Sequence, residues 1–230
     1  MTLFGGVPYD TNQISYLLLL SWLMLLVIGD CASGIPAARL LLRPQSFVLV
    51  RAGWKRWFRR VLLRCGICAL LVCGILLLPA LIRFPNWTTV LAWLLFTLHM
   101  EMIAAVQVLL IALFQSASAA TAPVLFTQLA SAFLSLRLPG AWAILLPGNW
   151  GSLARTAEGE APSLAVYLQR LYEWSLENEE ASKTSFADFI AARLHGGFPL
   201  WAAVALNLAV ILLIALFGWR PVRRRRRKLS

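Results

Sequence analysis

The sequence predicts an all-α membrane protein, a polytopic helix bundle with five full spans and a short outward re-entrant hairpin. Of its 230 residues, 60% are hydrophobic and only 13% are charged, whereas a soluble domain is about half apolar and a quarter charged. The mean hydropathy is +0.74. The apolar residues also gather in runs close to the ~20 residues that a helix needs to cross a bilayer. Too little polar surface remains to cover a soluble particle of this size.

Five apolar runs are the predicted spans. The first is short, but Tyr16, Trp22 and a few flanking residues bring it near the required length. The third is long and carries Glu101, and the fourth is richer in Ala, Ser and Thr. The predicted spans are residues 14–29, 61–82, 88–114, 117–136 and 198–219.

Residues 141–151 form a sixth apolar stretch that is too short to span a membrane. Pro and Gly bracket it on both sides, which indicates a hairpin. Backbone of this kind must be shielded by protein rather than by lipid. The stretch is therefore predicted to be an outer re-entrant hairpin with Pro147, Gly148, Asn149 and Trp150 at its tip.

Charge predicts the orientation of the chain. The connection 30–60 and the tail 220–230 are basic, with eight basic residues and no acid between positions 39 and 64. The loop 152–197 has seven acids and four bases, a net charge of −3. By the positive-inside rule, both basic segments belong in the cytoplasm and the acidic loop faces out. Five spans then place the N-terminus on the outer side of the membrane.

No motif of an enzyme or of a cofactor site is found. The sequence lacks H-E-x-x-H, G-x-S-x-G and the Walker A loop that binds ATP. Cys65 and Cys68 form a C-x-x-C pair, but they lie in an apolar run with no nearby His, so we interpret them as packing residues. His99 and Glu101 are two residues apart and point to opposite faces of a helix. We therefore predict no catalytic residue, cofactor or metal in this chain.

Glu101 is the most conspicuous single residue, because a carboxylate in the middle of a span costs about 2–4 kcal/mol. Thr97 and Gln115 lie on the same helical face. One interpretation is a translocation path or gate formed by Thr97, Glu101 and Gln115. The other is a polar contact that joins two helices. Both remain open from the sequence.

A basic segment with interleaved aromatic residues precedes the second span. Such a segment could bind nucleic acid, but its place between two spans indicates contact with the membrane surface and its anionic lipids instead. Composition supports this anchoring role for a segment that includes Arg51, Lys55, Arg56, Trp57, Arg59 and Arg60.

Two short motifs resemble a known family. In "VLVRAGWKRWFRR", the residues Arg51, Gly53, Lys55 or Arg56, and Trp57 resemble the Arg-x-Gly-x-(Arg/Lys)-x-x-Trp segment of permease subunits of type-2 ABC exporters. The closest group is the small bacterial permeases of peptide, lantibiotic and bacteriocin export or immunity systems. The stretch "LLPGNWGSLAR" resembles the outward hairpin before the last span of those proteins.

The resemblance implies a mechanism. Two permease subunits, either two copies or a copy and a paralogue, would enclose a path for a peptide or another amphipathic compound. A dimer of separate ATPase subunits would hold ATP and Mg²⁺ and contact the segment from Arg51 to Arg60. The family core has six spans with both termini in the cytoplasm, so the sequence departs from it by lacking the first span or by starting downstream of it.

Two alternatives compete with the transporter. The chain could be a non-transporting membrane protein for immunity or assembly that acts through its outer acidic loop, and deletion of residues 173–180 would then abolish its function. It could also be an intramembrane enzyme that uses Glu101 and His99, although their opposed faces argue against this.

Overall fold

The computed structural model describes residues 13–42, 46–83, 86–135, 140–153, 156–157 and 197–223. Within these ranges the chain is helical, with no β-strand and one isolated bridge between Thr156 and Phe198. The first twelve residues, most of the predicted acidic loop and the end of the basic tail lie outside them. The elements are α2 (Gln13–Leu41), α3 (Ser46–Arg83), α4 (Trp87–Phe114), α5 (Ala117–Ser135), the short 3₁₀ helices η1 (Gly140–Leu145) and η2 (Pro147–Asn149), and α8 (Leu200–Phe217).

The fold is all-α, as predicted. Two stretches of it, Trp87–Phe114 and Leu200–Arg223, are long and apolar enough to cross a membrane. The first is mostly buried inside the bundle, whereas the second leaves most of its apolar side chains on the surface.

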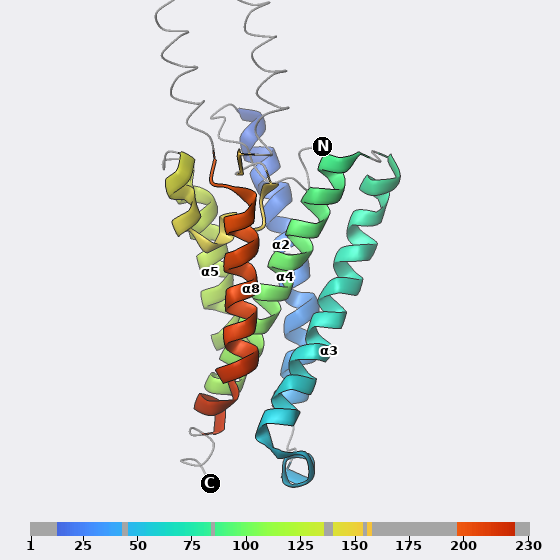
Figure 1. Cartoon of the computed structure of the whole chain (residues 1–230), viewed down its shortest axis with the longest axis vertical. Helices are drawn as coiled ribbons and strands as arrows, with labels where there is room; N and C mark the ends of the chain where they lie inside the picture. Colours follow the sequence, from blue (N-terminus) through green and yellow to red (C-terminus); the bar gives the residue numbers. More distant parts are fainter. Residues whose placement is uncertain are drawn as a thin grey trace, which may run out of the picture.

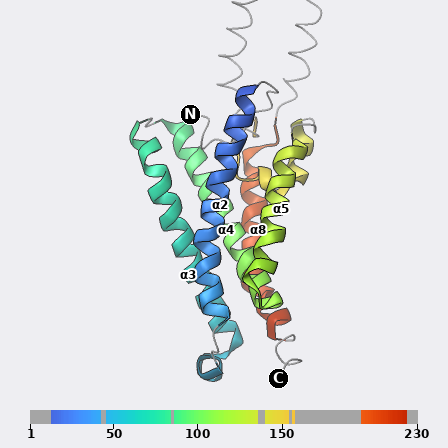
Figure 2. The same ribbon diagram turned by 180° about the vertical axis from the view of Figure 1, so that it is seen from behind.

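Helix α4 lies at the centre of the bundle. Helices α2, α3, α5 and α8 all pack against it, and the two opposite views show α8 on one side of α4 and α2 on the other (Figures 1 and 2). The four successive side chains of residues 102–105 are all buried, and four residues cover most of a helix's circumference. A helix that is apolar and buried all round has to be the core of its bundle.

Local chemistry fixes both ends of α4. Asn86 is the N-cap, and its Oδ1 accepts a hydrogen bond from the Thr89 amide at 2.8 Å. At the other end, Gln115 adopts a left-handed conformation with φ 57°, a common way to terminate a helix. Helix α5 begins two residues later, so α4 and α5 are antiparallel neighbours.

Helices α4, α5 and α8 cover the apolar runs of the sequence to within two residues at each end, but α2 and α3 do not. Helix α2 runs twelve residues past the first apolar run and ends at Leu41. The extra residues include Gly34 and Pro36, which disfavour a helix, but Ala37 and Leu41 are buried in a cluster with residues of α3 and α4. Packing therefore accompanies the helix beyond the apolar run, and Asp30 lies inside α2 rather than in a connection.

Helix α3 is divided by a bend at Gly53. Its backbone there has φ 72° and ψ 152°, far from helical values. The first part, residues 46–52, lies crosswise to the long second part and is seen end-on at the bottom of Figure 1. The basic segment of the sequence thus consists of a short crosswise helix, a glycine joint and the first two turns of a long helix.

The Gly53 joint gives a testable prediction. Its φ/ψ region is open essentially to glycine alone, so Gly53→Ala should reduce the free energy of unfolding by about 1–3 kcal/mol. No other atom lies within 4 Å of an added Cβ, so the cost comes from the backbone and not from a clash. The measurement is denaturant or thermal unfolding of the purified chain in detergent.

Gly74 is a matched control, because it lies in the same helix, has equally open surroundings and has no left-handed φ. Gly74→Ala should stabilise the helix by about 0.5–1 kcal/mol. Equal responses of the two alanine variants would rule out a strained joint at Gly53.

Candidate functional site

His99 of α4 is the centre of a buried polar network. Its side chain is 0% exposed. The ring atom Nδ1 lies 3.1 Å from Asn207 Oδ1 on α8, and Nε2 lies 3.3 Å from Gln128 Oε1 on α5. One imidazole thus joins three helices.

The network continues into the hairpin through Asn207. Its Nδ2 donates to the Trp150 carbonyl at 3.0 Å and to the Ala203 carbonyl at 2.9 Å. These two acceptors fix the orientation of the carboxamide, since a flipped amide would place its oxygen against two other oxygens. Oδ1 of Asn207 therefore faces His99 and accepts the Nδ1 proton.

The residues predicted for the hairpin tip form η2 and the residue that follows it. The Gly148 amide donates to Ser131 Oγ at 3.1 Å, and Asn149 Nδ2 donates to the Ala143 carbonyl at 2.9 Å. Trp150 Nε1 donates to the Ile144 carbonyl at 2.7 Å. The hairpin satisfies its polar groups internally and against α5, which irregular backbone at depth in a bundle requires.

A glycine permits the hairpin to approach the network. A Cβ on Gly151 would lie 2.6 Å from the His99 ring, closer than van der Waals contact allows. The backbone after η2 therefore lies directly on His99.

A second polar contact joins α2 to α4. Gln107 Nε2 donates to Asp30 Oδ1, and both side chains are buried. Gly34 permits this contact, because a Cβ there would be 3.3 Å from Gln107 Oε1. The pair lies two helical turns along α4 from His99.

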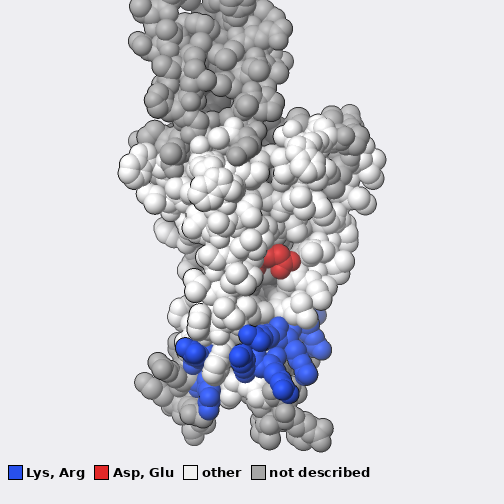
Figure 3. All heavy atoms as spheres, viewed as in Figure 1, with Lys and Arg blue, Asp and Glu red and all other residues white. Residues whose placement is uncertain are grey.

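Glu101 lies in the groove between α4 and α3. A Cβ on Gly66 would be 2.5 Å from Glu101 Oε2, so the carboxylate rests on the backbone of α3. Its side chain is partly exposed. On the face drawn in Figure 3, acidic atoms are visible at mid-height, apart from the basic end. His99 faces α5 and α8 instead, so these two residues do not share a site.

The predicted group of Thr97, Glu101 and Gln115 is not brought together as a unit. Thr97 is buried one turn before Glu101, and its Oγ1 has no hydrogen-bond partner among the described residues. Gln115 terminates α4, 14 residues or about 21 Å along the axis from Glu101. A shared helical face does not imply proximity along the helix.

A cavity of about 260 Å³ lies beside the His99 network. Helices α4, α5 and α8 and the hairpin form its walls. Most of its lining is apolar, and Thr127 and Gln128 of α5 supply the polar side chains. Helices α5 and α8 each pack along α4 but have little contact with each other, which leaves this space between them.

The basic segment lies at the end of the bundle opposite the hairpin. Lys55, Arg56, Arg59 and Arg60 are exposed, and basic side chains gather at this end of the face in Figure 3. Residues 220–223, which follow α8, reach the same end (Figure 1). Two basic blocks that are far apart in the sequence therefore meet. Arg51 belongs to the crosswise part of α3.

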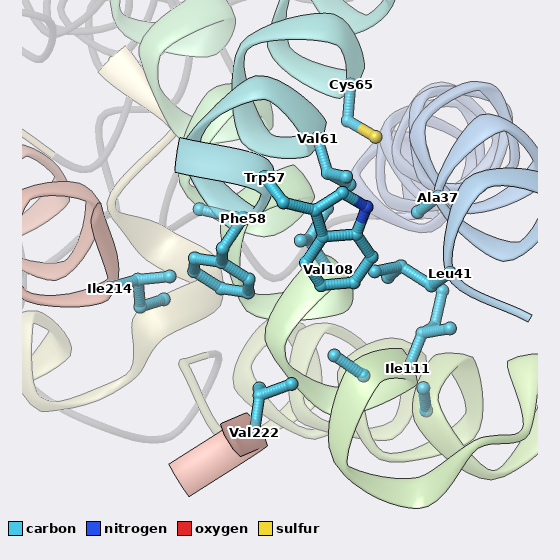
Figure 4. Close-up of a cluster of buried hydrophobic side chains, with 13 residues drawn as sticks. Ala37, Leu41, Trp57, Phe58, Val61, Cys65, Val108, Ile111, Ile214 and Val222 are labelled. Carbon is cyan, nitrogen blue, oxygen red and sulfur yellow. The ribbon is translucent and has the colours of Figure 1, made fainter. Parts of the chain in front are cut away.

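Trp57, which the sequence groups with these basic residues, is only 2% exposed. Trp57 and Phe58 point into a cluster formed with α2, α4 and α8 (Figure 4). In that view Phe58 faces Ile214, and the Trp57 ring lies near Leu41 and Val108. These two aromatic side chains are therefore buried against protein.

No family model, curated protein or solved structure matches this chain. Within the described residues, no group of three or more His, Cys, Asp and Glu is placed to hold a metal ion. Cys65 and Cys68 are free thiols in α3.

Four residues of the networks were not identified as functional from the sequence: Asp30, Gln107, Gln128 and Asn207. A signal existed for Asn207, because it is the one polar side chain among the residues of α8, Leu200–Phe217. Gln107 is a similar isolated amide in the second half of α4. A neutral amide in an apolar helix usually hydrogen-bonds to a neighbouring helix.

Proposed function

We propose that this chain is a permease subunit of an ATP-driven ABC exporter in a bacterial cytoplasmic membrane. Helices α2, α3, α4, α5 and α8 are its five spans. The length and composition of α4 and α8 support this, as do the many exposed apolar side chains of α3 and α5, such as Ile75 and Phe126. Soluble proteins rarely leave such continuous apolar surface open to water.

The distribution of charge supports the orientation. Basic side chains gather at one end of the bundle (Figure 3), and the hairpin lies at the other end (Figure 1). Lys and Arg accumulate on the cytoplasmic side of a membrane, so the C-terminus lies inside and the hairpin outside. The acidic loop and the N-terminus then lie outside as well.

Buried polar groups support transport rather than simple anchoring. A histidine, an aspartate and two glutamines lie within the bundle. Ionisable groups at membrane depth are costly, and they mark substrate or ion pathways more often than other positions do. Glu101 and the network around His99 are the groups that a moving subunit would rearrange.

The observation that carries the proposal is the crosswise helix at residues 46–52, joined through Gly53 to the long part of α3. This short helix lies at the basic end and is attached to one span. A partner that binds the helix and then moves can therefore displace that span. This arrangement supports the resemblance to type-2 ABC permeases. ATP and Mg²⁺ would bind to the partner ATPase dimer, and a second permease, identical or paralogous, would complete the path.

Charge reversal at the basic end tests this proposal. The tagged full chain, expressed with the genes that neighbour its own, should co-purify with an ATPase that contains G-x-x-x-x-G-K-[ST]. The double variant Lys55→Glu/Arg56→Glu should reduce the recovered ATPase at least tenfold, because both side chains are exposed and available to a partner. Arg59 is left unchanged because its Nε lies 3.5 Å from the Ala215 carbonyl of α8.

Arg220→Glu is the control, since Arg220 is an exposed basic residue at the same end on a different helix. It should preserve ATPase recovery. If no ATPase is recovered with the wild-type chain, the transporter proposal is wrong. Loss of function on deletion of residues 173–180 alone would then favour the immunity or assembly role.

A further inference from the structure

The cavity beside His99 has a polar end whose chemistry can be derived from the network. The orientation of Asn207 makes Nδ1 of His99 a donor, because Asn207 Oδ1 can only accept. If the imidazole is neutral, its Nε2 then carries a lone pair and needs a donor. The nearer atom of Gln128 is Oε1, at 3.3 Å, which is an acceptor.

Two arrangements can resolve this conflict. A charged imidazolium could donate to both oxygens, but it would be a cation in a fully buried site, and the described acids Asp30 and Glu101 face other helices. Alternatively, the Gln128 carboxamide is rotated by 180°, so that Nε2 donates to His99. The second arrangement costs only a rotation, and amide orientation is properly assigned from the hydrogen-bond network.

With Gln128 rotated, its Oε1 turns away from His99. Gln128 also lines the cavity. Thr127 is the other polar lining residue, and its hydroxyl donates a hydrogen bond to the Pro123 carbonyl at 2.7 Å. Toward the cavity this hydroxyl can therefore only accept a hydrogen bond. The indole N–H of Trp150 also has an acceptor already, because it donates to the Ile144 carbonyl. Among the described residues, the cavity therefore offers hydrogen-bond acceptors on Thr127 and Gln128, and its one remaining side-chain donor is the second N–H of the rotated Gln128 amide.

The rest of the wall is apolar, with Met102, Ile103 and Val106 from α4, Val124 from α5 and Val210 from α8. A volume of about 260 Å³ is somewhat below the usual range of about 300–1,000 Å³ for ligand pockets, so it suits a small or slender molecule. We propose that this cavity binds an amphipathic molecule whose apolar chain lies between α5 and α8 and whose N–H or O–H head donates to Gln128. This site goes beyond the proposed function, because binding there requires neither an ATPase nor transport.

The test uses photoactivatable decane probes and the purified full chain in phosphatidylcholine nanodiscs. The three probes carry the same diazirine on the chain and differ in the head: a primary amine, an alcohol or a methyl ether. Cross-linked positions are located by mass spectrometry. The amine or the alcohol should label the cavity residues about two- to tenfold more than the ether, the range expected for one additional hydrogen bond. The stronger of the two identifies the head group.

Two kinds of variant test the position and the polarity of the site. Val210→Trp should fill the space and abolish cavity labelling, whereas Leu213→Trp, on the exposed face of the same helix, should preserve it. Val124→Leu is a milder filling variant should Val210→Trp fail to fold, and it should reduce labelling. Gln128→Met keeps the volume and removes the acceptor, so it should abolish the preference for donor heads and leave labelling by the ether.

Three results would overturn the proposal: equal labelling by all three probes, labelling that persists in both filling variants, or labelling confined to lipid-facing residues, which would mean contact from the bulk bilayer only. Recovery of an ATPase in the co-purification experiment is a separate readout, so failure of one proposal does not imply failure of the other.

Discussion

Asn207→Leu is expected to destabilise the chain by about 2–6 kcal/mol. The substitution leaves the His99 Nδ1 proton and the Trp150 carbonyl without their partner, and each buried polar group left without a hydrogen bond costs about 1–3 kcal/mol. The measurement is the free energy of unfolding in detergent, together with hydrogen exchange of the hairpin amides. Exchange at the amides of residues 148–151 should accelerate, because the hairpin loses its hydrogen bond to α8.

Leu208→Ala is the control for this prediction. Leu208 is the next residue on α8 and its side chain is 43% exposed, so its truncation should change stability by no more than about 0.5 kcal/mol. If Asn207→Leu is as mild as this control, the network does not hold the hairpin on the bundle.

Phe58→Ala is expected to cost about 3–5 kcal/mol, the usual range for removing a fully buried aromatic side chain. Phe58 is 0% exposed and packs between the start of α3 and the end of α8, near Ile214 and Val222 (Figure 4). Gly218 permits this packing, since a Cβ there would lie 3.0 Å from the Phe58 ring. Unfolding of the purified chain measures the effect.

Phe133→Ala provides the comparison, because Phe133 of α5 is 51% exposed and its loss leaves no cavity. It should be nearly neutral in detergent. Phe58→Ala can also be compared with charge reversal at Lys55 and Arg56 in the same basic segment. Phe58→Ala should reduce stability, whereas the charge reversal should reduce partner binding and leave stability unchanged. Equal stability losses from Phe58→Ala and Phe133→Ala would contradict the packing in Figure 4.

The ends of helices could be predicted where the sequence has residues that typically start or terminate a helix. Asn86 marks the start of α4, and Pro and Gly flank the short stretch that becomes η1 and η2. The ends of α2 and α3 could not be predicted from hydrophobicity, since the helix extends through polar residues. The bend at Gly53 was also inaccessible, because glycine permits a left-handed φ without requiring it.

The candidate site was harder to predict than the helices. Glu101 was conspicuous because a charge in an apolar run is rare, whereas the partners of His99 are neutral amides, of which only Asn207 stands out as the one polar side chain of α8. Their contacts also join distant positions: His99 and Asn207 are 108 residues apart, and His99 and Gln128 are 29 apart. One-dimensional spacing indicates which side chains share a helical face and does not indicate which helix they meet.

The contact between Asp30 and Gln107 has a consequence for how the chain is made. The acid of the first described helix meets its amide partner only 77 residues later, which takes about 4–15 s at ordinary rates of synthesis. During that interval α2 carries a carboxyl group whose partner has not yet left the ribosome. We expect α2 to stay at the insertion machinery, or at a chaperone that shields its polar face, until α4 arrives. Synthesis and bundle assembly are in this respect one coupled process.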